Sequence, residues 1–166
     1  MKKRFLGIVM ALCMAVYFLP AMAFAASFPA NPIKVDLNGA DVDNDDYKID
    51  SAHSRIILRK KDVSYELTGT TDKKISIWGS NNSADIDQAF YIRLNNATIN
   101  GGIVVENSPV KLVLDVPSGT VNTISSVSAN DLTIQGAGTL KSNYVSVTQQ
   151  TSYMPSALHI TDTTIQ

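Results

Sequence analysis

Apolar and polar positions alternate in short segments that recur at a nearly constant spacing along the second half of the chain. The triplets Ile92-Arg93-Leu94, Leu112-Val113-Leu114 and Leu132-Thr133-Ile134 are equally spaced, and Leu158-His159-Ile160 follows after a slightly longer interval. An alternating apolar triplet is typical of a β-strand with one buried face. The repetition therefore predicts several strands that occupy equivalent positions in the fold.

A second strand signal, threonine followed by an aliphatic residue, comes shortly after each triplet. Its copies are Thr98-Ile99, Thr120-Val121, Thr139-Leu140 and Thr164-Ile165. A single coil of about 20 residues cannot enclose a core, so it must bury its inward side chains against neighbouring coils. We therefore expect an all-β fold, a right-handed parallel β-helix, whose handedness follows the general preference of crossover connections. A β-sandwich is the alternative, since the turn signals suit it as well.

Stacked strands lie about 4.8 Å apart, so equivalent residues of successive coils should form ladders. Two inward ladders are predicted to be aliphatic: Ile92, Leu112, Leu132, Leu158, and Leu94, Leu114, Ile134, Ile160. The outward ladders are predicted to be polar or mixed: Tyr91, Lys111, Asp131, Ala157; Arg93, Val113, Thr133, His159; and Asn95, Asp115, Gln135, Thr161.

The predicted β-helix domain spans residues 54–166, with further strands at 55–58, 63–68 and 74–78. Residues 27–53 are predicted to be a linker and N-terminal cap, with a short strand at Ile33–Leu37. Because Gln166 lies inside a coil, we expect the domain to be incomplete at its C-terminus or to pair end to end with another copy.

Residues 1–26 have the features of a bacterial export signal. Lys2, Lys3 and Arg4 precede an apolar run, and small residues after Pro20 offer cleavage sites. The single cysteine, Cys13, lies inside this signal, so the mature chain has neither a disulfide nor a Cys-based metal site. Cleavage changes the formal charge from −1 to −4, which disfavours nucleic acid, and leaves no apolar stretch long enough to span a membrane. The expected location is extracellular or at the cell surface.

A calcium loop is the one metal motif that the sequence suggests. Asp41, Asp43 and Asp45 have its spacing, but Asp46 replaces the turn glycine and Ala52 replaces the bidentate glutamate. A solvated acidic turn therefore explains this segment better, and no cofactor is predicted.

Several segments resemble a family of secreted bacterial proteins described as carbohydrate-binding domain-containing. The resemblance covers about residues 54–166 and rests on Tyr65-Glu66-Leu67-Thr68-Gly69-Thr70, Phe90 to Ile99, Val110 to Asn122, Leu132 to Leu140, and Ser156-Ala157-Leu158-His159. It implies a right-handed β-helix with a non-catalytic, carbohydrate-binding role, and it supplies no catalytic motif.

Aromatic and charged residues of outward parity are the candidate binding residues, because aromatic rings stack on sugars while polar neighbours bind hydroxyls. They are Trp78, Tyr91, Arg93, Lys111 and Asp115. The alternative role of Trp78 is to pack against the loop of residues 79–88.

Three functions remain open from the sequence. A secreted module that binds a polysaccharide or cell-surface glycan, without being an enzyme, is favoured. A structural or adhesive surface protein that binds another protein is the second. A truncated polysaccharide lyase-like enzyme is the third, although Asp115 and Asp131 lie on different predicted ladders, and His53 and His159 are expected to be solvated.

Overall fold

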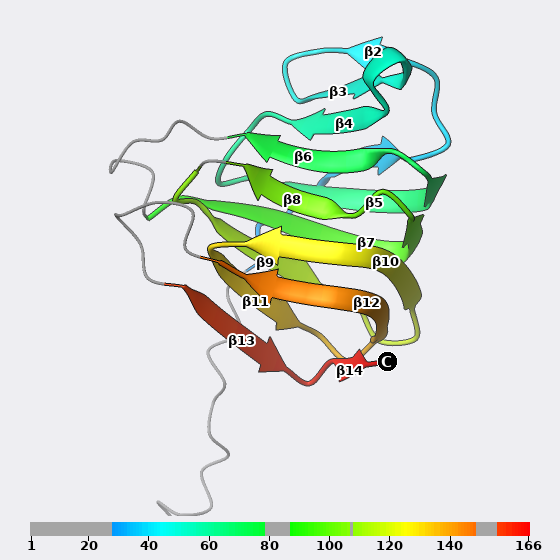
Figure 1. Cartoon of the computed structure of the whole chain (residues 1–166). Coiled ribbons are helices and arrows are strands. Elements are labelled where there is room, and N and C mark those ends of the chain that lie inside the picture. The colour runs from blue at the N-terminus through cyan, green and yellow to red at the C-terminus, as the bar shows by residue number, and fades with distance from the viewer. Residues whose placement is uncertain (1–27, 79–86, 107, 149–155) are drawn as a thin grey trace, which may run out of the picture.

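The computed structural model describes residues 28–78, 87–106, 108–148 and 156–166, and this part of the chain is all-β (Figure 1). It contains a 14-stranded mixed sheet and one short 3-10 helix, η1 (Ser51–His53). The predicted export signal, including Cys13, lies outside the described residues. Among the residues that are described, no helix is long and apolar enough to cross a membrane.

The strands follow one another with short connections. In chain order they are β1 (Ile33–Asp36), β2 (Val42–Asp43), β3 (Tyr47–Asp50), β4 (Arg55–Leu58), β5 (Ser64–Thr71), β6 (Lys74–Trp78), β7 (Ala89–Ile99), β8 (Ile103–Glu106), β9 (Lys111–Asp115), β10 (Val121–Ala129), β11 (Asp131–Gln135), β12 (Thr139–Val147), β13 (Ala157–Thr161) and β14 (Thr164–Ile165).

Most strands pair in parallel with the strand one repeat away. The first parallel stack contains β1, β5, β7, β9, β11 and β13. The second contains β4, β6, β8, β10 and β12. A third parallel run is formed by the last residues of β5 and β7, the first residues of β10 and β12, and β14. Each of these segments pairs with the next in that order. Figure 1 shows the strands one above another, from β4 down to β13 and β14.

The predicted ladders are correct from β9 through β11 to β13. In β7, the first strand of the ladders, the pairing is displaced by two residues. Phe90, not Ile92, pairs with Leu112, and Ile92 pairs with Leu114, so the first repeat is longer than predicted. From Leu112 onward the pairing is as predicted, through β11 to β13. A shift by a full period keeps every side chain on its predicted face, because side chains alternate between the two faces of a strand.

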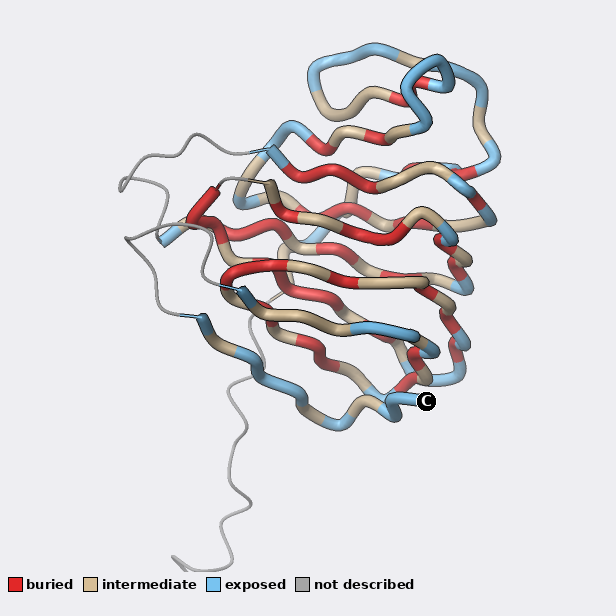
Figure 2. Tube along the Cα trace, in the orientation of Figure 1, coloured by how far each residue is buried: buried red, intermediate tan, exposed pale blue. Residues whose placement is uncertain are grey.

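Inward side chains from β1 to the start of β12 form one continuous hydrophobic core. Figure 2 shows the resulting alternation of buried and more exposed positions along the strands. The rings of Tyr65 and Phe90 stack in this core with their centroids 6.3 Å apart, and burial raises the pKa of Tyr65. The last members of the two ladders, Leu158 and Ile160, are 42% and 48% exposed, because β13 is the terminal strand of the sheet order.

The segment predicted to be a linker and cap is folded. β1 coincides with the strand expected at Ile33–Leu37 and pairs in parallel with β5. β2 and β3 pair antiparallel, and β3 joins β4 in the same way, which makes the sheet mixed. The Tyr65 hydroxyl ties this region to the core by donating to the Asp46 carbonyl (2.9 Å) and accepting from the Lys60 amide (2.8 Å).

Candidate functional site

The outward side of β4, β6 and β8 carries an exposed tryptophan among charged side chains. We call this surface the Trp78 face; its residues are Arg55, Lys74, Ser76, Trp78 and Glu106. Ile75 and Ile77 of β6 point into the core, so the residues that alternate with them point outward. Trp78 is 49% exposed, which agrees with the outward orientation predicted from its parity.

Arg55 lies over the indole of Trp78, with its guanidinium carbon 5.2 Å from the ring centroid. Arg55 begins β4 and Trp78 ends the neighbouring β6, so the two side chains approach each other along the strand direction. Ser76 also points outward between these positions, yet it is only 1% exposed. Side chains of the Trp78 face therefore cover the sheet, and the indole is held beside a cation.

Glu106 carries the negative charge of this face. Its carboxylate accepts from the Lys74 ammonium at 2.6 Å and from the Ser76 hydroxyl at 3.3 Å. Glu106 also stands opposite Trp78 in the register of β6 and β8. The indole is therefore bordered by a lysine–glutamate pair as well as by Arg55.

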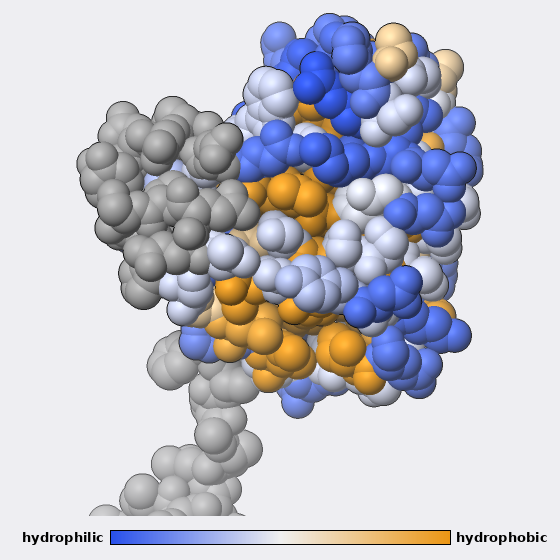
Figure 3. All heavy atoms as spheres, viewed as in Figure 1, coloured by the Kyte–Doolittle hydropathy of each residue, from blue (hydrophilic) through white to orange (hydrophobic). Residues whose placement is uncertain are grey.

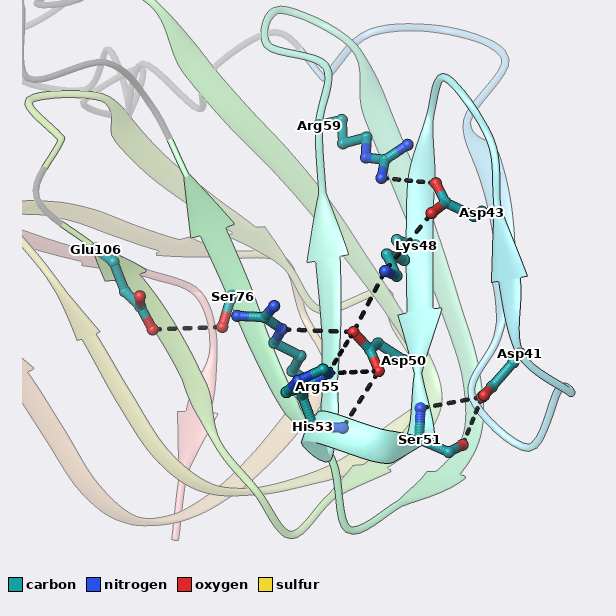
Figure 4. A network of polar contacts seen from close by, with 10 residues as sticks. All are labelled: Asp41, Asp43, Lys48, Asp50, Ser51, His53, Arg55, Arg59, Ser76 and Glu106. Carbon is teal, nitrogen blue, oxygen red and sulfur yellow. Dashed lines mark hydrogen bonds and ion pairs between the residues drawn. The ribbon is translucent and has the colours of Figure 1, made fainter.

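Asp50 is the centre of a charged network at the edge of this face (Figure 4). Both of its carboxylate oxygens lie 2.9 Å from Nδ1 of His53, and the Lys48 ammonium lies 3.4 Å away. The hydrogen bond from His53 is the main reason why the pKa of Asp50 falls from 3.8 to about 2. Asp50 therefore remains a carboxylate at any physiological pH.

The lowered pKa makes a prediction about stability in acid. A carboxyl group with a depressed folded-state pKa stabilises the fold above its unfolded pKa, and this contribution is lost as the pH falls through the folded value. We expect the thermal midpoint to drop between about pH 4 and pH 2, and to drop less in Asp50→Asn. Scanning calorimetry across this range measures both; parallel curves for the two proteins would contradict the assignment.

A polar hollow of about 440 Å³ adjoins the Trp78 face where β4 and β6 begin. Ser54 and Lys73 in its wall directly precede Arg55 and Lys74 of the face. The remaining wall is rich in hydroxyl, amide and carboxylate groups and consists of Leu37, Asn38, Ser51, Thr70, Thr71 and Asp72. Such groups are suited to hydrogen bonds with the hydroxyls of a sugar.

The other predicted binding residues lie on the first stack, away from Trp78 in the sheet order. Arg93 and Asp115 are brought together, with Nε and a carboxylate oxygen 2.7 Å apart. Phe28 packs beside this pair. Its ring lies edge-on to that of Tyr91, with the ring centroids 5.8 Å apart, and the Arg93 guanidinium carbon lies 4.6 Å from the centroid of the Phe28 ring. Tyr91 and Arg93 thus hold the N-terminal segment in place.

The predicted pairing of Tyr91 with Lys111 is wrong. Ala89 stands beside Lys111, and Val113 stands beside Tyr91, as a result of the longer first repeat. Val113 is also buried despite its outward parity. Lys111 is thus not directly opposite the aromatic residue with which it was grouped.

Two of the three acidic residues suggested for calcium, Asp41 and Asp43, are engaged in contacts within the protein. Asp41 accepts from the Ser51 amide at 3.0 Å, and Asp43 forms an ion pair with Arg59 at 2.7 Å, while Asp45 is exposed. Within the described ranges, no three His, Cys, Asp or Glu residues are grouped so that they could hold a metal ion. Asp41 and Asp43 are thus bound within the protein, whereas Asp45 faces solvent.

Sequence reasoning missed two residues of this side of the molecule. Arg55 was assigned to a strand, but its contact with Trp78 depends on the register of β4 and β6. Tyr144 of β12 is 62% exposed and stands opposite Ser126 of β10 in the second stack. Its position in a mixed segment, next to Val145, gave no clear periodicity. Figure 3 views this side and shows hydrophilic residues at the upper end, with apolar residues in the middle and towards the lower end.

Comparisons of the chain with models of known protein families, with curated proteins and with solved structures gave no match.

Proposed function

We propose that this chain is a secreted, non-catalytic carbohydrate-binding module built on a right-handed parallel β-helix. The parallel register of successive strands, repeated from β5 through β13, supports the helical path of the chain. The charged n-region, apolar run and small-residue cleavage sites of residues 1–26 support export. The resemblance to secreted bacterial carbohydrate-binding proteins supports the class of ligand, a polysaccharide or cell-surface glycan.

The exposed indole of Trp78 is the observation that carries the proposal. An aromatic ring that is half exposed on a rigid sheet can stack on the apolar face of a pyranose with little further loss of conformational freedom. Lys74 and Glu106 offer a donor and an acceptor to the hydroxyls of a sugar stacked on Trp78, and the hydroxyl-lined hollow at the opposite end of β6 suits a further residue of the same glycan chain. This combination of one stacking ring and nearby polar groups is suited to a shallow glycan site.

Three carboxylates, Asp50, Glu106 and Asp115, support a binding role rather than hydrolysis. Glycoside hydrolysis requires two converging carboxyl groups, one of them with a raised pKa. Asp50 has a pKa lowered to about 2, and the carboxylates of Glu106 and Asp115 each bind a cation within 2.7 Å. The Asp50 carboxyl is therefore a poor proton donor, while Glu106 and Asp115 are engaged in ion pairs.

Trp78→Ala is the decisive variant for this proposal. We expect its affinity for glycans that the wild-type protein binds on an array to fall about 10- to 100-fold in calorimetry, as for an interface residue that dominates binding. Tyr91→Ala is the matched control, because it removes an aromatic ring from the other stack. Wild-type protein that binds no glycan, or unchanged affinity in Trp78→Ala, would favour the structural or adhesive role instead.

A further inference from the structure

The cations around the Trp78 face differ in how fully they are paired. Lys74 lies 2.6 Å from Glu106, Arg59 lies 2.7 Å from Asp43, and Lys48 lies 3.4 Å from Asp50. These cations are therefore neutralised by carboxylates of the protein itself.

Arg55 is the exception among these cations in the part of the chain that the structure describes. Its Nε is buried, lies 3.9 Å from the nearest oxygen of Asp50 and has no hydrogen-bond partner. That distance makes an ion pair but exceeds a hydrogen bond. Asp50 is a weak partner for Arg55, because its two oxygens already accept from His53 at 2.9 Å. The guanidinium is thus stacked on Trp78 with a donor that no described acceptor satisfies.

We propose that the Trp78 face binds an acidic saccharide, with the Arg55 guanidinium binding the sugar carboxylate while the pyranose ring stacks on Trp78. This inference rests on the carbohydrate-binding function proposed above and names its ligand class. Because Nε is buried, the two terminal nitrogens of the guanidinium are the atoms that would bind the ligand. They match a carboxylate with two parallel hydrogen bonds, which an ammonium group cannot do.

The two groups lie close enough for one sugar residue to contact both. The guanidinium carbon is 5.2 Å from the centroid of the indole. In a uronic acid the carboxyl carbon is bonded directly to the pyranose ring, so the ring and the carboxylate of the same residue can reach Trp78 and Arg55 together. Glu106 does not oppose this binding with a free charge, because Lys74 holds it at 2.6 Å.

The test compares uronic-acid polysaccharides with their carboxyl-reduced forms, in which each carboxylate becomes a hydroxymethyl group on an unchanged ring. Polygalacturonate, alginate and hyaluronan serve as probes in calorimetry with the full mature chain. We expect the wild-type protein to bind at least one acidic probe about tenfold or more tightly than its reduced form. Arg55→Gln should abolish this preference, and Arg55→Lys should restore it only in part. Lys34→Gln, which removes an exposed charge from β1 in the first stack, should leave it unchanged.

The outcomes separate the ligand class from the function. If the acidic and reduced forms bind equally well, and Trp78→Ala loses this binding, the proposal of an acidic ligand would be overturned. The carbohydrate-binding function would stand. A preference for acidic probes that persists in Arg55→Gln would also overturn the role of Arg55. If neither form binds, and Trp78→Ala does not change the binding of the protein to a glycan array, both proposals would be overturned. Circular dichroism of each variant confirms that the fold is retained.

Discussion

Replacing Leu114 by alanine is expected to lower the free energy of unfolding by about 2–5 kcal/mol. Leu114 is fully buried in β9 and stands between Ile92 of β7 and Ile134 of β11 in one inward ladder. Truncation removes buried apolar surface and leaves a cavity between two rigid strands that cannot close without breaking their pairing. Urea denaturation followed by circular dichroism measures the change.

Ile160→Ala is the matched control, because Ile160 occupies the next-but-one position of the same ladder. Its side chain is 48% exposed at the terminal strand, so much less apolar area is lost on truncation. We expect a loss of less than about 1 kcal/mol, as for a partly exposed site. Equal losses at Leu114 and Ile160 would contradict the register of the ladder.

Gly136→Ala is the second substitution with a large expected effect, about 2–5 kcal/mol of stability from backbone strain plus overpacking. Gly136 follows β11 with a φ of +100°, a conformation that residues with a Cβ rarely adopt. A Cβ at this position would lie 2.4 Å from the Val116 carbonyl oxygen, which belongs to the backbone and cannot move aside. The close approach lets Gly138 donate to the same carbonyl at 2.8 Å and keeps the two repeats in contact.

Gly119→Ala separates the two causes. Gly119 also has a positive φ, +78°, but a Cβ there would meet nothing within 4 Å. We expect only the strain of the left-handed conformation, about 1–2 kcal/mol. Thermal unfolding of both variants under the same conditions gives the difference, and a Gly136→Ala protein as stable as Gly119→Ala would show that the repeats do not approach so closely.

The all-β class was predictable because the inward positions repeat in both spacing and chemistry. Leu112, Leu132 and Leu158 align in the structure as their spacing in the sequence indicated. The error in the first repeat arose because β7 continues from Ala89 to Ile99 without a turn, so the sequence does not mark which apolar residue faces β9. The inward and outward faces were still predicted correctly, because the register differs from the predicted one by two residues.

The candidate site was predictable only in part, because its contacts join strands that are distant in sequence. The exposure of Trp78 followed from its parity in β6. Its partner Arg55 did not, because β5 intervenes in the chain and only the pairing of β4 with β6 brings the two residues together. Phe28 was likewise not foreseen as the cover of Tyr91 and Arg93, since nothing in a proline-containing segment indicates what it packs against.

Trp78 is the only tryptophan of the chain, so intrinsic fluorescence reports on this one side chain without any mutation. Titration of the wild-type protein with a glycan that binds in calorimetry should shift the emission to the blue or quench it, because stacking removes water from the exposed indole face. The fluorescence change should saturate with the same dissociation constant as the heat of binding. Glycan binding in calorimetry with an unchanged emission spectrum would place the ligand elsewhere and contradict the role of the Trp78 face.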